Sequence, residues 1–134
     1  MTIEAGQHLP ELVIEVTPTF VISTALATRD FQDVHHDRDR AVARGSKDIF
    51  LNILTTTGLV QRYVTDWAGP QALVRKVAIR LGAPCYAGDT LTFSGQVLDE
   101  PVGEGEVLVQ VTGRCSLGDH VTGTVRIALP GSPR

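Results

Sequence analysis

The chain has 134 residues, of which 43% are hydrophobic and 20% are charged, the balance usual for one globular domain. Twelve lysines and arginines against fifteen aspartates and glutamates give a net charge of −3, which argues against a dedicated nucleic-acid binder or a protein that docks on an anionic membrane. We therefore expect a single domain over residues 1–134, with flexibility confined to residues 1–7 and 130–134.

The N-terminus does not indicate a signal peptide, and the cysteines do not indicate a metal site. Residues 1–5 (MTIEA) lack the basic start and apolar run of a signal peptide, and no apolar run approaches the length of a membrane span. The two cysteines, Cys85 and Cys115, show neither metal-ligand spacing nor a disulfide framework, so they are interpreted as core or strand residues. We expect a cytoplasmic protein without a metal site.

The first elements are short and lead into a long polar stretch. Residues 20–23 (FVIS) favour a short strand, and residues 24–28 favour about one helical turn. Residues 29–44 are rich in charge and have no clear periodicity. A long irregular segment inside a compact domain is usually functional or disordered. A solvated polar loop explains the same residues equally well.

A long helix is predicted over residues 46–67. Its first residue is a plausible N-cap, Asp48 suits the positive end of the helix dipole, and residues 69–70 (Gly-Pro) end the run. Residues 55–57 are three threonines of poor helix propensity, so we expect burial to maintain the helix there and Gly58 to permit close approach of the sheet. The apolar stripe consists of Ile49, Phe50, Ile53, Leu54, Val60, Val64 and Trp67.

Everything after Pro70 alternates between apolar and polar residues, as strands with one buried face do. The predicted strands are Leu73–Leu81, Thr90–Leu98, 107–115 and 120–129, with turns at 100–105 and 117–119. One long buried helix followed by a meander of antiparallel strands predicts an α+β fold, in which an antiparallel sheet wraps around a long central helix.

Within the polar stretch, Asp30 and His35 are the residues best suited to chemistry. A carboxylate and a neutral imidazole that converge on one water can share its deprotonation and the handling of an α-proton, which suits hydration or dehydration. A separation of five residues does not establish such a pair, because any loop rich in Asp and His offers similar pairs. From the residues alone, catalytic pair and solvated loop both remain open.

The chain resembles the MaoC-like hydratases in three segments. Their D-x-N-P-x-H pattern is similar to residues 30–35 (DFQDVH), their Asp-Trp helix end to residues 66–67, and their P-x-x-x-G-D-T-L segment to residues 84–91 (PCYAGDTL). The resemblance spans residues 20–129. Residues 23–37 are most similar to the small catalytic subunits of actinobacterial steroid side-chain enoyl-CoA hydratases.

The resemblance implies a hot-dog fold and an enoyl-CoA hydratase that adds water to the α,β-double bond of a bulky, steroid-derived acyl-CoA in steroid or cholesterol side-chain degradation. Asp30 and His35 are the implied catalytic pair, with either one as the base. The implied partner is a second MaoC-like chain that lacks the pair, or else a copy of this chain. No metal, redox cofactor or nucleic acid is implied.

The sequence departs from the family pattern at two places. Residues 32–33 are Gln-Asp where the family has Asn-Pro, and residues 49–53 (IFLNI) replace a helix entry that contains His-Gly. In this family, backbone N–H groups at the helix entry form the oxyanion hole. Because such amides do not require a glycine, the donors are predicted at the backbone of Asn52 and Ile53.

Two rival functions on the same fold remain open. A hot-dog acyl-CoA thioesterase would use Asp48 as its carboxylate, and a non-catalytic CoA-binding partner subunit would need no catalytic pair. Within the motif, His36 is a second candidate base and Asp33 a second candidate carboxylate. The motif position favours His35 over His36, which we expect to be a surface or interface residue.

Overall fold

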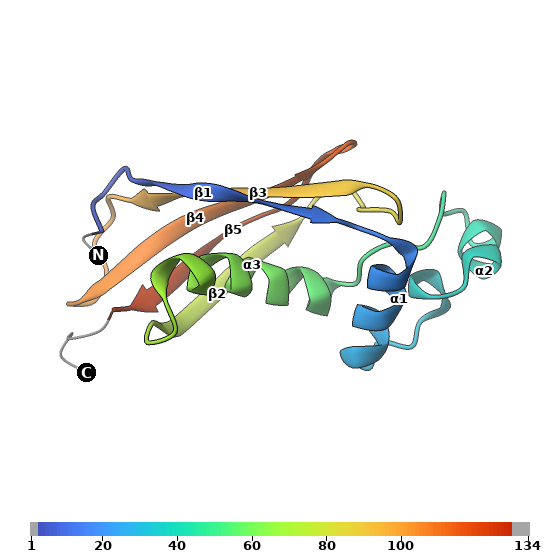
Figure 1. The fold of residues 1–134 in the computed structure, drawn as a ribbon, viewed down its shortest axis with the longest axis horizontal. Helices are drawn as coiled ribbons and strands as arrows, with labels where there is room; N and C mark the ends of the chain where they lie inside the picture. Colours follow the sequence, from blue (N-terminus) through green and yellow to red (C-terminus); the bar gives the residue numbers. More distant parts are fainter. Residues whose placement is uncertain (1–2, 130–134) are drawn as a thin grey trace.

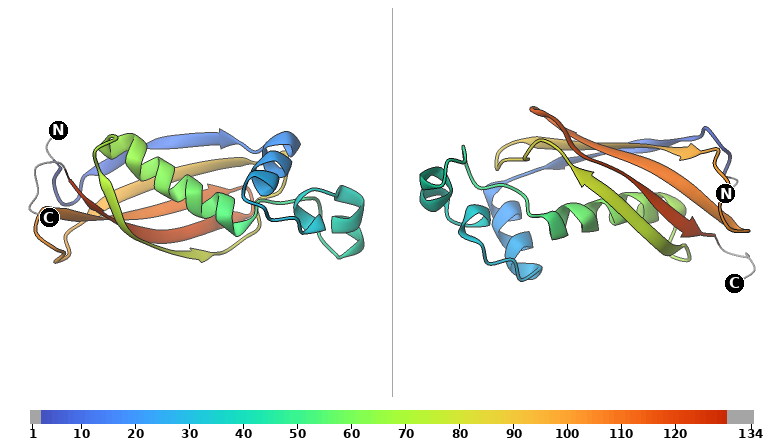
Figure 2. Two further views of the ribbon diagram at one scale, coloured as in Figure 1. Left: turned by 90° about the horizontal axis from the view of Figure 1, so that it is seen from below. Right: turned by 180° about the vertical axis from the view of Figure 1, so that it is seen from behind.

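The computed structural model describes residues 3–129 and confirms the predicted α+β architecture. Five antiparallel strands form one sheet in the order β1-β3-β4-β5-β2. The sheet curves around helix α3 (Ile53–Ala68), which lies across its concave face (Figures 1 and 2). The strands are β1 (His8–Glu15), β2 (Leu73–Leu81), β3 (Thr90–Leu98), β4 (Glu106–Cys115) and β5 (Gly118–Ala128).

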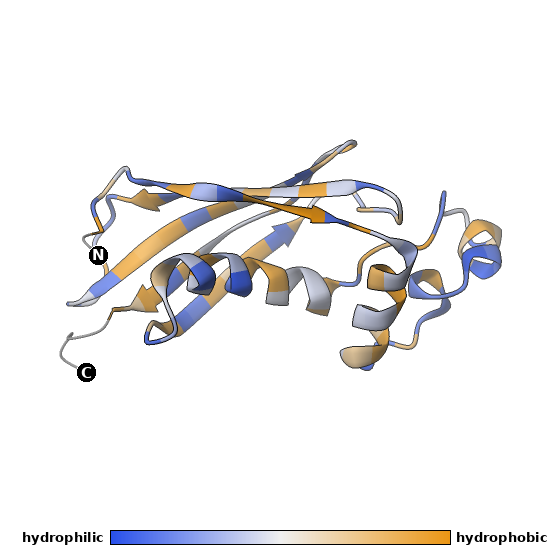
Figure 3. Ribbon diagram, in the orientation of Figure 1, coloured by the Kyte–Doolittle hydropathy of each residue, from blue (hydrophilic) through white to orange (hydrophobic). Residues whose placement is uncertain are grey.

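The core lies between α3 and the inner face of the sheet. Along each strand apolar and polar residues alternate, which gives the banding in Figure 3, and the apolar set points toward α3. At its centre the ring of Phe93 on β3 stacks on Tyr63 of α3, with 5.7 Å between ring centroids. Two predicted strands, β2 and β3, begin and end at the expected residues, because an alternating pattern with one buried face fixes a strand well.

Helix α3 begins at Ile53 and not at residue 46, so the predicted helix start was wrong. Residues 49–51 are extended and pair with the loop before β3: Leu51 N–H donates to Cys85 O, Ala87 N–H donates to Ile49 O, and Phe50 bridges Tyr86. This pairing satisfies backbone groups that a helix would otherwise satisfy. Asp48 therefore lies ahead of the helix and outside its first turn.

The buried face of α3 also differs from the predicted stripe. Ile53 and Leu54 are half exposed, at 51% and 52%, and the same end of the helix buries threonines instead. Gly58 is exposed, and a Cβ built on it meets nothing within 4 Å, so the expected close approach of the sheet at this glycine was wrong. The residues of α3 that are buried are Thr55, Thr56, Leu59, Val60, Tyr63 and Val64.

Residues 18–27 form helix α1 (Pro18–Ala27), so the strand predicted at residues 20–23 was wrong. Thr17 is the N-cap and accepts a hydrogen bond from Phe20 N–H at 3.0 Å, and Pro18 stands at the first helical position. The polar stretch that follows contains a 3₁₀ turn (Asp33–His35) and a short helix α2 (Arg38–Ala43). All three elements lie beyond the end of the sheet, at the N-terminal end of α3 (Figure 1).

Both ends of the described chain hydrogen-bond to the sheet or to the turn between its strands: at the C-terminal end, Leu129 N–H donates to Gly105 O at 3.1 Å. Gly6 N–H donates to Val97 O at 2.8 Å, and Val97 N–H donates to Gln7 O at the same distance. Of the termini expected to be flexible, residues 1–2 and 130–134 lie outside the described residues. Between residues 3 and 129, no helix combines the length and apolar character needed to cross a membrane.

Candidate active site

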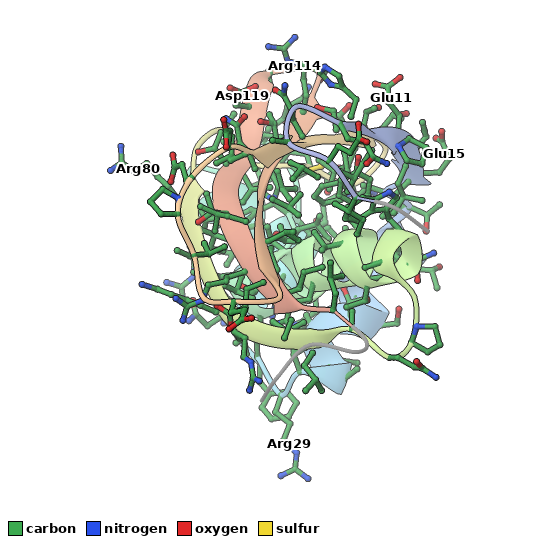
Figure 4. All side chains as sticks on the ribbon, turned by 90° about the vertical axis from the view of Figure 1, so that its left-hand side faces the viewer. Glu11, Glu15, Arg29, Arg80, Arg114 and Asp119 are labelled. Carbon is green, nitrogen blue, oxygen red and sulfur yellow. The ribbon has the colours of Figure 1, made fainter. Side chains whose placement is uncertain are left out.

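Asp30 is placed by a tight turn at the end of α1. Asp30 N–H donates to Ala25 O at 2.9 Å and Arg29 N–H donates to Leu26 O at 3.0 Å, which closes the helix end. The turn requires a left-handed backbone at Arg29, with φ of 58°, and this is the only positive φ at a non-glycine among residues 3–129. The Arg29 side chain points away from the body of the molecule (Figure 4), while the Asp30 side chain is 16% exposed.

His35 is buried on the 3₁₀ turn, and a backbone carbonyl orients its ring. Nδ1 lies 2.8 Å from the carbonyl oxygen of Phe50, and the ring packs edge-on against the Phe50 ring with 4.9 Å between centroids. A carbonyl oxygen only accepts hydrogen bonds, so Nδ1 carries the proton. In the neutral ring, Nε2 therefore presents a lone pair, and it lies 3.6 Å from Oδ2 of Asp30.

The separation between Asp30 and His35 suits a shared water. At 3.6 Å, the carboxylate oxygen and the imidazole nitrogen are too far apart for a good direct hydrogen bond. Each can instead accept one proton of the same water molecule, since both are acceptors in this state. The structure thus brings together the two residues singled out in the sequence, in an arrangement able to bind and deprotonate water.

The start of α3 supplies open backbone donors beside this pair. The first N–H groups of a helix have no partner inside the helix, and those of Asn52 and Ile53 find none elsewhere among the described residues. The helix dipole adds positive potential at the same end. Phe50, which orients His35, is only two residues before Asn52. The amides predicted as oxyanion donors are therefore close in the chain to Phe50, the residue that orients His35.

Two contributors to the site were not found from the sequence. The carbonyl of Phe50 fixes His35 from 15 residues away, and the side chain of Asn52 hydrogen-bonds to Thr28 from 24 residues away. Both contacts are long-range, and a backbone carbonyl leaves no trace in the residue type. The presence of a polar residue, Asn52, inside an apolar helix entry was the one available signal.

The other two candidates in the motif, Asp33 and His36, lie in different surroundings from the pair. The carboxylate of Asp33 lies 2.8 Å from Nε of Arg44 and 3.8 Å from Nη1 of Arg40. His36 is half-buried beside a hollow of about 510 Å³ that Asp33 and both arginines also line. An ion pair explains Asp33, and His36 faces this hollow rather than the anchor of His35.

Asp48 is held by Arg38 and by the neighbouring backbone. Its Oδ1 lies 2.8 Å from Nε of Arg38 and accepts a hydrogen bond from Ile49 N–H at 2.7 Å. Partial burial raises the pKa of the Asp48 carboxyl, but these hydrogen bonds lower it more, and the net pKa lies below its usual range. A carboxylate held in this way is a poor general base.

One cluster within residues 3–129 has the residue types of a metal site. Ligand atoms of Cys85, Asp89 and Cys115 lie within 4.8 Å of one another. Burial, together with nearby Cys115 and Asp89, raises the pKa of the Cys85 thiol to about 12, so the thiol is protonated at neutral pH. Asp89 already accepts hydrogen bonds from Ser116 and from Thr90 N–H. These hydrogen bonds account for the position of Asp89 without a metal.

A second buried histidine supports α3 from the sheet. His120 on β5 is 3% exposed; its Nε2 lies 2.8 Å from the Thr56 hydroxyl and its Nδ1 lies 2.8 Å from the carbonyl oxygen of Ala83. Because the carbonyl accepts the Nδ1 proton, the hydroxyl donates to Nε2, and the neutral ring fits the site. Burial lowers the pKa of His120, against the opposing effect of the Ala83 bond.

Residues 4–116 match the family model of the MaoC like domain. The chain belongs to the MaoC-like family. This confirms the family predicted from the sequence, and the hot-dog fold with it.

Known relatives place the chain more finely within the MaoC-like family. It is 65% identical over 127 residues to the 3-oxo-4,17-pregnadiene-20-carboxyl-CoA hydratase beta subunit of Mycobacterium tuberculosis, which covers 95% of this chain and 97% of that one. A chain in the crystal structure of the ChsH1-ChsH2 complex from the same organism is 64% identical, with a TM-score of 0.90 over 96% of this chain and 99% of that one.

A distant structure shares the fold. The (R)-hydratase from A. caviae involved in PHA biosynthesis superposes with a TM-score of 0.87 at 18% identity, over 96% of this chain and 98% of that one. At this identity the similarity concerns the hot-dog fold alone.

Proposed function

We propose that this chain is the catalytic subunit of an enoyl-CoA hydratase that adds water to the α,β-double bond of a steroid-derived acyl-CoA. The observation that carries the reaction is the arrangement of Asp30 and His35, with 3.6 Å between Oδ2 and Nε2 and His35 anchored on Phe50. The 65% identity to a hydratase subunit, over 95% of the chain, supports the same reaction and gives the substrate as 3-oxo-4,17-pregnadiene-20-carboxyl-CoA.

The proposed reaction starts from a water molecule bound by both side chains. His35 Nε2 takes one proton as the water oxygen bonds to the β-carbon, and Asp30 accepts a hydrogen bond from the remaining hydroxyl proton. The electron pair of the double bond shifts onto the thioester as an enolate. The imidazolium, stabilised by the nearby carboxylate, then returns its proton to the α-carbon. The product is the β-hydroxyacyl thioester, and both residues are restored.

The start of α3 stabilises the enolate in this proposal. The thioester oxygen gains negative charge only as water adds, and the amides of Asn52 and Ile53 donate to it at the positive end of the helix dipole. Preorganised donors of this kind favour the transition state over the ground state.

A partner chain completes the proposed enzyme. Among the described residues, β2 pairs with β5 along one edge and with no strand along the other, and such an edge is normally covered. Ile53 and Leu54 beside the site are half exposed. A fused-ring acyl group needs a cavity that α3, seated in the concave face of the sheet, leaves little room for. A second MaoC-like chain with a shortened helix would provide that space, and the related solved chain belongs to a two-component complex.

The rival functions are less well supported. The thioesterase hypothesis needs a free carboxylate at Asp48, which instead pairs with Arg38 at 2.8 Å. The non-catalytic hypothesis does not account for Asp30 and His35 facing one another. We further propose a cytoplasmic location, since Cys85 and Cys115 are free thiols, as expected in a reducing compartment.

The decisive experiment uses the assembled protein. The chain is purified from its native host with whatever co-purifies, and the two chains are then co-expressed and incubated with 3-oxo-4,17-pregnadiene-20-carboxyl-CoA. Loss of the enoyl-thioester ultraviolet absorbance, with a mass gain of one water and no release of free CoA, is the expected result. Release of CoA without hydration would establish the thioesterase instead, and CoA binding without turnover the non-catalytic subunit.

Light scattering and activity measurements on the isolated chain test whether a second, non-identical chain is required. We expect the isolated chain to be inactive or unstable with the steroid thioester and to become active when mixed with the second chain. Full turnover by a pure homodimer would contradict the hetero-oligomer and leave the hydratase proposal intact.

A further inference from the structure

Asn52 lies at the N-cap of α3, yet its side chain does not cap the helix. The residue is 2% exposed. Its amide nitrogen donates to the Thr28 hydroxyl at 2.8 Å, and its amide oxygen accepts from the Thr55 hydroxyl. We propose that the Asn52 side chain is a positioning residue, which fixes the Asp30 turn against α3 and leaves the amides of the helix start open for the substrate. This inference rests on the proposed hydratase function.

Each hydrogen bond in the network has one possible direction. The Thr28 hydroxyl gives its own proton to Thr24 O at 2.8 Å, shared with Ala25 O at 3.1 Å, and so it accepts from Asn52. The Thr55 hydroxyl in turn donates to the oxygen of the same amide. Each hydroxyl and the amide thus has a defined direction, and the three side chains connect the last turn of α1 to the first turn of α3.

What the network holds is the turn that carries Asp30. Thr28 is the C-cap of α1, and the next residue, Arg29, has the left-handed φ of 58° that L-residues rarely adopt. Such a conformation persists only when its surroundings impose it. The hydrogen bond from Asn52 to Thr28 connects this turn to the helix that bears the proposed oxyanion donors. The Asp30 carboxylate and those donors are thereby held in a fixed position relative to one another.

The same network leaves backbone amides at the start of α3 without a hydrogen-bond partner. An asparagine at the N-cap ordinarily accepts a hydrogen bond from the second or third amide of its helix. Here the Thr55 hydroxyl occupies the amide oxygen instead, and no side-chain cap bond forms. The N–H group of Leu54, which such a cap could bind, consequently has no partner among residues 3–129, and neither does that of Ile53. The open amide of Leu54 adds to those of Asn52 and Ile53 and to the positive potential at the helix start.

The test is a set of variants in the assembled two-chain enzyme. Thr28→Val keeps the shape of the side chain and removes the acceptor for Asn52; we expect kcat to fall about 10- to 100-fold with little change in KM, as for a catalytic group displaced by less than about 1 Å. Thr28→Ser restores the hydroxyl and should recover most of the loss. Thr65→Val removes a hydroxyl that bonds its own helix, to Gln61 O at 3.0 Å, and serves as the matched control.

A double-mutant cycle separates positioning from folding. Asn52→Ala should lower kcat at least as much as Thr28→Val. The double variant should have the same kcat as Asn52→Ala alone, because all three variants lose the same hydrogen bond between Asn52 and Thr28. Additive losses, or a Thr28→Val rate equal to that of Thr65→Val, would overturn the inference. If the wild-type enzyme does not hydrate the steroid thioester, the proposed function is wrong. If the wild type hydrates it and Asp30→Asn does not, the function stands and the Thr28 and Asn52 variants test only the positioning role of Asn52.

Discussion

The sheet and the active-site segment (residues 28–52) are stabilised by different physics. The buried residues of β3, β4 and β5 are almost all apolar; Phe93, Val109, Val125 and Ile127 are fully buried against α3. The active-site segment, which contains the proposed site, buries fewer apolar side chains, chiefly Ala41, Ile49 and Leu51, and its polar residues are held by directed bonds, such as those of His35 to Phe50 and Asn52 to Thr28.

The two regions should therefore respond differently to substitution. Apolar packing is non-directional, so the sheet should tolerate changes that conserve volume and lose stability in proportion to the volume removed. Directed polar contacts fix atoms in place, so the active-site segment should lose activity before it loses stability. Substitutions in the two regions should therefore separate a loss of activity from a loss of stability.

The catalytic pair should show the largest effect. Asp30→Asn or His35→Ala should lower kcat about 10²- to 10⁴-fold, the range for loss of a general acid or base, while thermal unfolding changes little. Asp39→Asn and His8→Ala make the same chemical changes at exposed positions and should retain activity. Near-normal rates in folded Asp30 and His35 variants would show that the pair is not catalytic.

The core should show the opposite pattern. Phe93→Ala removes a fully buried ring stacked on Tyr63, and it should lower the free energy of unfolding by about 3–5 kcal/mol. Denaturant unfolding of the assembled two-chain protein measures this, and Phe31→Ala, at a residue 64% exposed, should change it by less than about 0.5 kcal/mol. Equal losses at the two positions would contradict the predicted contrast.

His120 should make stability depend on pH. In the unfolded chain an imidazole binds its proton near pH 6.5, whereas burial lowers the pKa of His120 in the folded protein. Between those two pKa values the unfolded state binds more protons, so stability falls as pH falls below about 6.5, by at most about 1.4 kcal/mol per pH unit. The loss stops once the pH is below the folded pKa.

Two substitutions isolate this contribution. His120→Gln should be less stable at neutral pH, since it loses the bonds to Thr56 and Ala83, but its stability should vary less between pH 7 and 5. Exposed His8→Gln should keep the wild-type pH profile. An unchanged profile in His120→Gln would assign the acid sensitivity elsewhere.

Asp48→Asn should have the smallest effect. The residue belongs to the active-site segment, but among residues 3–129 its carboxylate hydrogen-bonds only to Arg38 and to the backbone N–H of Ile49. Exposed ion pairs contribute little, so hydration should stay within about twofold of wild type. If the variant instead lost a thioester hydrolysis activity, Asp48 would be catalytic and the thioesterase hypothesis would gain support.

The sequence was most informative where structure is local. The alternation in residues 73–81 and 90–98 predicted β2 and β3 because strand periodicity and one buried face are properties of the segment itself. For α1, the pattern of residues 20–23 was misinterpreted as a strand, although Thr17 and Pro18 form a recognisable helix start.

Where structure is non-local, the sequence was less informative. Residues 46–52 were predicted as helix, but pairing with Cys85 and Ala87 keeps residues 49–51 extended, and no local pattern contains that contact. For the site, spacing alone left Asp30 and His35 ambiguous, and family resemblance singled them out. The side chain of Asn52 was missed because its bond to Thr28 spans 24 residues.

The uncapped start of α3 has a consequence for ligand design. A helix end with free amides and no acidic side chain in its first turn attracts anions. In the proposed reaction the anion bound here exists only while the enolate does, so a stable compound with a permanent negative charge at the proposed position of the thioester oxygen should bind far more tightly than the neutral substrate. An enolate-mimicking CoA analogue is thus a rational starting point for an inhibitor, and the amides of Asn52 and Ile53 are the contacts to build it around.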